Sequence, residues 1–197
     1  NGTSRGVSAA SAVFEISANG VSSKRVTVTG QPAAHPDGLT ALAALPTGDL
    51  LAVDASTSRV LMLKPSIGAQ SVVTTIPNLP SCLTTVFVAP CEQGSMDRKP
   101  QLAGIAIDPS GNAYITDSGQ GVVWRLPSGA TKATLFYSPA DLATGDGPAG
   151  IGFDSGHNLL LTVGQPLDRP NLENGGLHLS GRNARGTAGA PTRAPRC

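Results

Sequence analysis

The sequence contains few charged and few aromatic side chains for its 197 residues. Charged residues make up 14%, the formal net charge is +1, and only seven residues are Phe, Tyr or Trp. Nucleic-acid surfaces carry clustered basic residues, commonly with aromatic side chains between them, so this composition excludes a nucleic-acid partner. No apolar run approaches the roughly 18 residues of a membrane span, so we expect none.

Motifs for metal and phosphate binding are also missing. There is no Cys-x-x-Cys and the three histidines are scattered, which excludes a zinc site with the usual ligand spacing. The glycine-rich stretch Gly145–Gly150 leads into an expected strand, not a helix, so it does not predict a phosphate-binding loop. The sequence therefore indicates an architecture more directly than an activity.

Glycine and proline are abundant, with 24 and 16 copies, or about one residue in five. This proportion is too high for long helices and is typical of a chain that turns often. Apolar residues make up 40%, which is enough for a hydrophobic core. Val, Ile, Leu and Thr dominate short apolar runs, and these favour β-strands. We therefore predict an all-β fold.

An internal repeat organises the sequence. The three matching segments are 37–54, 102–117 and 148–163. Each contains an apolar run rich in small residues, a turn with glycine, and a second apolar run. We expect Gly48, Gly111 and Gly156 to supply the positive φ that a tight hairpin needs. The small residues are expected on inner strands, where neighbouring strands crowd one another.

Further apolar runs follow the hairpins. We expect third strands at 59–64 and 122–126, fourth strands at 71–76 and 132–137, two strands of an earlier unit at 12–16 and 24–28, and a strand of a later unit at 175–179. Four consecutive strands, repeated, are typical of propeller blades. The prediction is a β-propeller of four-stranded antiparallel blades, partial, with about three blades.

The spacing of the repeats indicates an insertion. Gly111 and Gly156 are 45 positions apart, which is the length of one blade, whereas Gly48 and Gly111 are 63 apart. The excess falls at 77–100, which is either a functional loop or a tolerated surface insertion. Its Cys82 and Cys91 form a disulfide or are two unrelated buried thiols. We expect a secreted or periplasmic protein.

The domain prediction follows from these repeats. Residues 1–180 are assigned to the partial propeller, and the Arg-containing segment 181–197 is expected to be a disordered basic tail. The blade portions are expected at about 12–30, 36–76, 100–137 and 147–179.

Residues 104–119, Gly-Ile-Ala-Ile-Asp-Pro-Ser-Gly-Asn-Ala-Tyr-Ile-Thr-Asp-Ser-Gly, resemble an NHL repeat. They equally resemble repeats of the gluconolactonase and strictosidine-synthase-like propellers, and the first unit matches through Asp54 and Arg59-Val60. This resemblance implies a six-bladed ring, of which the chain would be a fragment. Missing blades or a second copy would then close the ring. The superfamily includes metal-dependent lactone hydrolases, other small-molecule enzymes and interaction scaffolds.

For the lactone hydrolases, the resemblance implies a metal held by Glu from a Glu-Gly-Pro opening, by Asn residues heading inner strands, and by Asp. This sequence has no Glu-Gly-Pro, and no Asn-Gly heads an expected inner strand. Those ligands could reside in blades that this chain does not contain.

Asp37 and Asp146 are the main candidate site residues. Both stand at the entrance to inner strands and both precede glycine. Carboxylates there could bind a divalent metal such as calcium or polarise a water, and His35 could act as a base or ligand. The alternative is ordinary Asp-Gly turns and a loop histidine. Asp54 and Asp117 are expected to accept backbone N–H bonds in the turns that follow them.

Asp108 and Asp154 precede hairpin turns, and we expect the same structural role for them. The predicted function is a binding or recognition scaffold for a small molecule or a protein at the channel-mouth loops. The alternative is a metal-dependent lactone hydrolase or related enzyme with Asp37, Asp146 and His35 at its site. Whether the protein is an enzyme stays open at this point.

Overall fold

A computed structural model describes residues 3–4, 7–8, 10–32, 37–82, 90–92, 97–139, 142, 146–164 and 177–180. The strands are β1 (Thr3–Ser4), β2 (Val7–Ser8), β3 (Ala12–Ile16), β4 (Ser22–Thr27), β5 (Leu39–Ala44), β6 (Leu50–Asp54), β7 (Arg59–Lys64), β8 (Ala69–Thr75), β9 (Leu102–Ile107), β10 (Ala113–Asp117), β11 (Val122–Leu126), β12 (Thr134–Tyr137), β13 (Pro148–Phe153), β14 (Leu159–Val163) and β15 (Leu177–Ser180). No helix of the described residues has the length and apolar character needed to cross a membrane.

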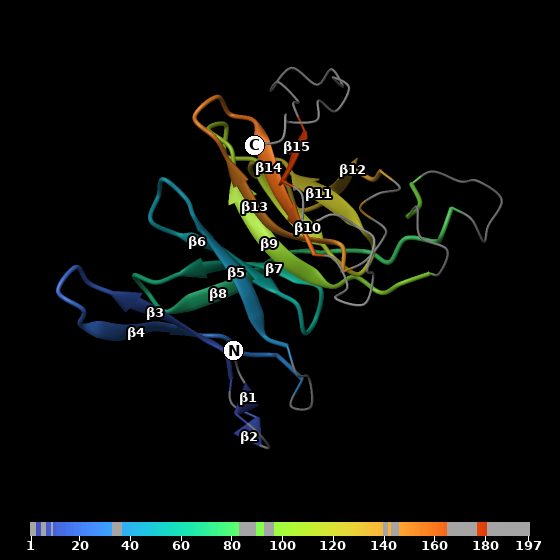
Figure 1. Cartoon of the computed structure of the whole chain (residues 1–197). Coiled ribbons are helices and arrows are strands. Elements are labelled where there is room, and N and C mark those ends of the chain that lie inside the picture. Colours follow the sequence, from blue (N-terminus) through green and yellow to red (C-terminus); the bar gives the residue numbers. More distant parts are fainter. Residues whose placement is uncertain are drawn as a thin grey trace.

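The strands form antiparallel sheets in which sequence neighbours pair (Figure 1). Two sheets have four strands, in the orders β5-β6-β7-β8 and β9-β10-β11-β12. A third has β13-β14-β15, and β3 pairs with β4 alone. The prediction of an all-β chain with four-stranded antiparallel units is confirmed. Short turns allow consecutive strands to pair antiparallel, whereas parallel pairing needs a crossover of about a dozen residues or more.

The turns between the first two strands of each unit differ from the prediction in one residue that takes positive φ. Gly48 and Gly111 have positive φ, 85° and 81°, as predicted, but Gly156 does not, and His157 takes the left-handed conformation with φ 62°. The reason is a five-residue turn in which an aspartate binds the asparagine four positions later. The pairs are Asp108 with Asn112 and Asp154 with Asn158.

These bonds confirm the structural role predicted for Asp108 and Asp154. The two aspartates are 46 positions apart, so His157 is equivalent to Gly111 and the predicted alignment on Gly156 was wrong by one residue.

The inner strands β5, β9 and β13 lie beside one another, with β9 in contact with both of the others (Figure 1). Gly104 of β9 stands so close to β13 that a Cβ atom would lie 2.5 Å from the Ala149 carbonyl oxygen. The Thr116 hydroxyl accepts the Gly104 N–H and donates to the Ala149 carbonyl, both at 2.7 Å. Crowding therefore explains this small residue, whereas a Cβ atom built on Gly152 would have open space around it.

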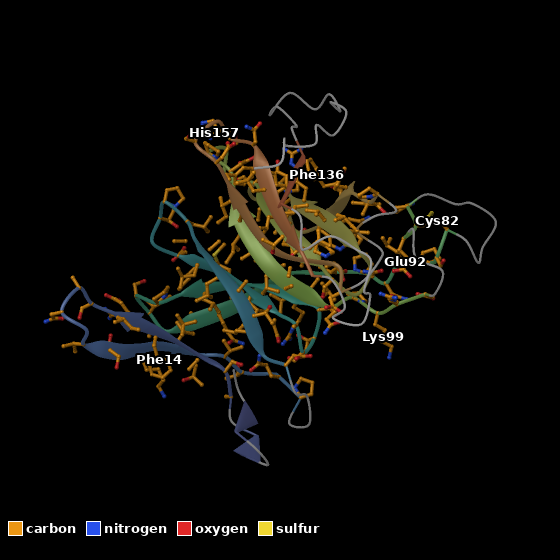
Figure 2. The ribbon with its side chains drawn as sticks, in the orientation of Figure 1. Phe14, Cys82, Glu92, Lys99, Phe136 and His157 are labelled. Atoms are coloured by element: carbon orange, nitrogen blue, oxygen red, sulfur yellow. A yellow bond between two sulfur atoms is a disulfide. The ribbon has the colours of Figure 1, made fainter. Side chains whose placement is uncertain are left out.

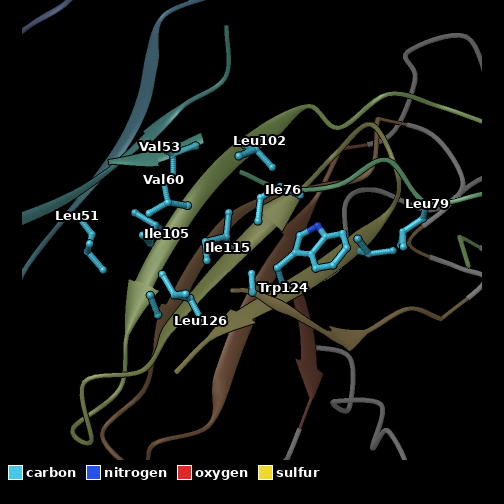
Figure 3. Close-up of a cluster of buried hydrophobic side chains, with 13 residues drawn as sticks. Leu51, Val53, Val60, Ile76, Leu79, Leu102, Ile105, Ile115, Trp124 and Leu126 are labelled. Carbon is cyan, nitrogen blue, oxygen red and sulfur yellow. The ribbon is translucent and has the colours of Figure 1, made fainter. Parts of the chain in front are cut away.

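The largest core lies between the two four-stranded sheets. Figure 3 shows Trp124 at its centre, with Ile115 beside it and Val53 and Val60 of the other sheet nearby. A second cluster joins β3 and β4 to β6 and β7, and a third joins the β9–β12 sheet to the β13–β15 sheet. Each sheet thus buries its apolar side chains against a neighbouring sheet, as stacked repeats do.

One row of apolar side chains crosses the first four-stranded sheet and is only partly covered. The register places Leu42, Ala52, Leu61 and Val72 side by side. Ala52 and Leu61 are buried beneath the β3–β4 sheet, but Leu42 and Val72 are 45% and 51% exposed. Closure of a ring by further blades or a second copy stays a prediction. The disordered basic tail predicted at 181–197 lies outside the described residues and also stays a prediction.

Candidate functional site

A cleft of about 680 Å³ opens where the first four-stranded sheet meets the start of the second. Its walls come from the approaches to β5 and β9, the β6–β7 turn and the end of β8. The lining residues are Asp37, Ala55, Ser56, Thr57, Ser58, Thr75, Ile76, Asn78, Lys99, Pro100 and Gln101. Apart from Thr75, all of these residues lie in loops or turns, where binding residues commonly lie on a rigid β-scaffold.

Asp54, which is fully buried, organises one wall. Its carboxylate accepts hydrogen bonds from the hydroxyls of Ser56 and Thr57, from Arg59 at 2.9 Å and from Gln31 at 3.0 Å. Burial by itself would raise the pKa of Asp54, but these hydrogen bonds outweigh burial and hold it below its ordinary value of 3.8. An ionised Asp54 thus orients two cleft hydroxyls, through side chains where we had expected backbone N–H groups.

Asp117 is equally buried and holds the facing wall. Its carboxylate accepts the Gln101 N–H at 2.9 Å, the Gln120 N–H at 3.1 Å, the Gln120 amide at 2.7 Å and the Trp124 indole N–H at 3.2 Å. The bond from the Gln120 N–H confirms the turn role predicted for Asp117. Because Gln101 lines the cleft, the same carboxylate also fixes a cleft residue.

Gln120 extends this network to the insertion. Its amide donates to the Pro77 carbonyl at 3.1 Å, and its Oε1 accepts the Leu79 N–H at 2.5 Å. Pro77 and Leu79 flank Asn78, which lines the cleft. Sequence reasoning missed Gln120, Asn78 and Lys99. Nothing local marks Gln120, whose partners lie about 40 positions away, and Asn78 and Lys99 join the cleft only through the way the insertion folds back.

The structure places the predicted site residues in different surroundings. Asp37 lines the cleft, whereas the Asp146 carboxylate lies against Gly164, whose Cβ position would be 3.4 Å from Asp146 Oδ2. Asp37 and Asp146 each stand two residues before an inner strand, β5 and β13, and β9 lies between these strands. His35 falls outside the described residues.

A metal site is not assembled from these residues in the part of the chain that the structure describes. That part contains no group of three or more His, Cys, Asp or Glu side chains that could hold a metal ion. We derive no chemistry through a metal ion. The role of Asp37 and Asp146 in a calcium or other divalent-metal site, and that of His35, stays a prediction.

The insertion contains a disulfide between Cys82 and Cys91. Beside it lies Glu92, whose side chain is fully buried. Figure 2 shows Cys82, Glu92 and Lys99 on the same side of the molecule. Glu92 Oε1 accepts the Arg98 N–H at 2.9 Å, while Oε2 has no hydrogen-bond partner among the described residues. A buried carboxyl oxygen without a partner is costly when it is charged.

Burial raises the pKa of Glu92 above its ordinary value of 4.5. The N–H of Arg98 opposes this effect, while the negative charges of Asp97 and Asp117 add to it. The folded chain therefore binds a proton at Glu92 more tightly than the unfolded chain does. Stability from this group is complete below about pH 4.5 and is lost as the pH rises through the higher pKa of the folded state.

The substitution Glu92→Gln should remove this loss. The variant keeps an oxygen for the Arg98 N–H and carries no charge, so we expect it to be more stable than the wild type at neutral pH. Thermal unfolding followed across the acid-to-neutral range should show the difference shrinking towards pH 4.5. Glu15→Gln, at an exposed ion pair with Arg25, is the control and should show no such trend. A Glu92→Gln chain less stable than wild type at neutral pH would contradict the burial argument.

Comparison with solved structures identifies the fold. The chain is similar to virginiamycin B lyase from Staphylococcus aureus (17% identity, TM-score 0.54, 78% of this chain and 42% of that chain) and to a putative gluconolactonase (16%, 0.53, 88% and 52%). It is also similar to a chain of a nidogen–laminin complex (16%, 0.54, 85% and 52%). The chain is a partial β-propeller. It spans about half the length of these structures and supplies about three blades.

These likenesses extend to the propeller scaffold alone, since the identities are low. No protein-family profile matches the chain, and no curated protein is similar to it in sequence. Within the propeller, the cleft lies between the first and second complete blades, on the face where the inner strands begin.

Proposed function

We propose that this propeller binds a small, uncharged, polyhydroxylated molecule, such as a saccharide or an aldonolactone, in the cleft. This proposal rests on the size and the lining of the cleft. Its volume of about 680 Å³ lies within the range of roughly 300–1,000 Å³ typical of small-molecule sites. Its two walls are fixed from behind by the buried carboxylates Asp54 and Asp117, so the lining groups are held in place before a ligand arrives.

The chemistry of the lining supports an uncharged polar ligand. The lining has four hydroxyl side chains and two amides. The hydroxyls of Ser56, Thr57 and Ser58 donate to protein oxygens and so face a ligand as acceptors, while the amides and Thr75 can supply donors, so the set can pair with ligand hydroxyls. The charged groups are one carboxylate, Asp37, and one ammonium, Lys99, so the lining has no net charge. A neutral ligand with several hydroxyl groups matches this set better than an anion or a cation does.

The similar solved structures include a protein named for a small molecule and a protein that binds another protein. One similar protein is described as a putative gluconolactonase, and another belongs to a nidogen–laminin complex, which is an association between proteins. The volume of the cleft and its polar lining favour the small molecule for this chain. The disulfide supports our further proposal of an oxidising location, secreted or periplasmic.

The test is an NMR titration of the full chain, labelled with 15N, with D-glucose, D-galactose and D-glucono-1,5-lactone. The amide signals of Ser58, Lys99 and Gln101 should shift with at least one of these probes. Lys99→Ala should weaken that binding about tenfold, the effect of one lost hydrogen bond to a charged group. Lys132→Ala, at an exposed turn outside the cleft, is the matched control and should bind as wild type.

Two results would overturn the proposal: no shift at the cleft with any probe, or equal affinity in Lys99→Ala and wild type. The lactone also tests the alternative, metal-dependent lactone hydrolysis. Acid release that needs added calcium and is lost in Asp37→Asn would favour the hydrolase. Binding without calcium-dependent acid release would favour the binding scaffold.

A further inference from the structure

The two ends of the insertion run side by side and are joined covalently. Ser81 and Glu92 form a parallel β-bridge. The Cys82 N–H donates to the Glu92 carbonyl at 2.7 Å, and the Glu92 N–H donates to the Pro80 carbonyl at 3.0 Å. The Cys82–Cys91 disulfide joins the residues next to this bridge. The described ends of the insertion therefore behave as one stapled unit.

The same unit carries one wall of the cleft. Asn78 and Lys99, which both line the cleft, lie on its two ends. The Asn78 amide donates to the Asp97 carboxylate at 2.8 Å. Lys99 directly follows Arg98, whose N–H donates to Glu92 Oε1 at 2.9 Å. A displacement of Glu92 would therefore be passed to Lys99 through a single hydrogen bond and one peptide unit.

Without the covalent bond, the part of the wall around Glu92 and Arg98 would be held by its hydrogen bonds. The buried position of Glu92 is itself unfavourable when the carboxyl is charged, because its Oε2 has no partner among the described residues. The Gln120 amide would still hold the Pro77–Leu79 end, so the change should concentrate at 91–92 and 97–99. Cutting the disulfide is thus expected to loosen Lys99 while leaving the blades intact.

We infer that the thiol–disulfide state of Cys82 and Cys91 regulates ligand binding in the cleft, an inference that rests on the function proposed above. Reduction requires a dithiol, either small or protein-borne. Its thiolate attacks a sulfur of the disulfide, forming a mixed disulfide and releasing the other cysteine as a thiolate. The second thiol of the reductant then displaces the first cysteine. The protein gains two thiols, and the dithiol becomes a disulfide.

The exposure of the two cysteines sets where attack begins. Cys91 is 5% exposed, whereas Cys82 is half-buried. We therefore expect the reductant to attack the Cys82 sulfur, with the Cys91 thiolate leaving first.

The first measurement does not depend on any ligand. Arg98 and Lys99 provide a trypsin cleavage site within the wall. The full chain carrying Cys197→Ser, which has only the cysteines of the disulfide, is digested with trypsin before and after treatment with dithiothreitol. We expect cleavage at Arg98–Lys99, followed by mass spectrometry, to become about tenfold faster on reduction, as for a locally opened segment. Cleavage after Lys132, outside the insertion, should keep its rate.

The second measurement uses the saccharide or lactone that binds best in the oxidised chain. Its affinity should fall on reduction, and equally in Cys82→Ser/Cys91→Ser without any reductant. Unchanged cleavage at Arg98, or unchanged affinity, overturns the regulation. Faster cleavage together with no binding by the oxidised chain counts against the proposed function itself, and the regulation falls with it. The two failures are therefore distinguishable.

Discussion

Replacing Asp117 by alanine should lower the free energy of unfolding by about 3–5 kcal/mol, the cost typical of breaking a buried, hydrogen-bonded charge. Asp117 has no exposed surface and accepts four N–H donors, two of them from Gln120. Its removal leaves the Gln120 backbone N–H and the Trp124 indole N–H buried without this acceptor. Because Gln101 and the Gln120 amide position both sides of the cleft, ligand binding should be lost with stability.

Urea unfolding measured by intrinsic fluorescence of Trp124 would give this free energy. Asp117→Asn is an intermediate variant. It keeps one acceptor oxygen but replaces the other with an NH2 group, a donor that would face the donors of the Gln120 amide and the Trp124 indole. It should lie between the wild type and the alanine variant. Asp97→Ala removes an exposed carboxylate with one hydrogen bond, to Asn78, and should cost at most about 1 kcal/mol. An Asp117→Ala chain as stable as Asp97→Ala would show that the hydrogen bonds to the buried Asp117 carboxylate do not stabilise the fold.

Gly104→Ala should destabilise the fold by about 3 kcal/mol, at the upper end of overpacking effects. The added methyl group would stand 2.5 Å from the Ala149 carbonyl oxygen and 3.1 Å from a methyl group of Ile151, both on the next inner strand. The nearer atom belongs to the backbone and cannot rotate away. The strand would have to move, and with it the Thr116 hydroxyl bond that links the two blades.

Gly152→Ala provides the matched control on β13. Nothing lies within 4 Å of the position that its Cβ would occupy. We expect a change within about 0.5 kcal/mol, or a small gain from the stiffer unfolded chain. Both variants can be compared by chemical unfolding under one set of conditions. Equal losses in the two would show that general strand propensity, and not contact between blades, decides these positions.

The units of the propeller could be predicted from the sequence because their interactions are local. Apolar runs such as 59–64 and 122–126 can pair with the run before them through a short turn, which needs no information from distant residues. The same locality explains why the turn roles of Asp108 and Asp154 were predicted correctly. The alignment failed at His157, because a histidine can adopt the left-handed conformation that was expected of Gly156.

The candidate site could not be predicted in the same way, because its residues are distant in the sequence. The cleft joins residues near position 37, the β6–β7 turn and the end of the insertion, and Gln120 reaches partners about 40 positions away. The equivalence of Asp37 and Asp146 was visible in the repeat, but β9 lies between their strands. The burial of Glu92 likewise depends on how the insertion folds back. Periodicity and turns are properties of neighbouring residues and can be found in the chain alone; which side chains share a cleft depends on how the blades stack, and only the folded arrangement decides it.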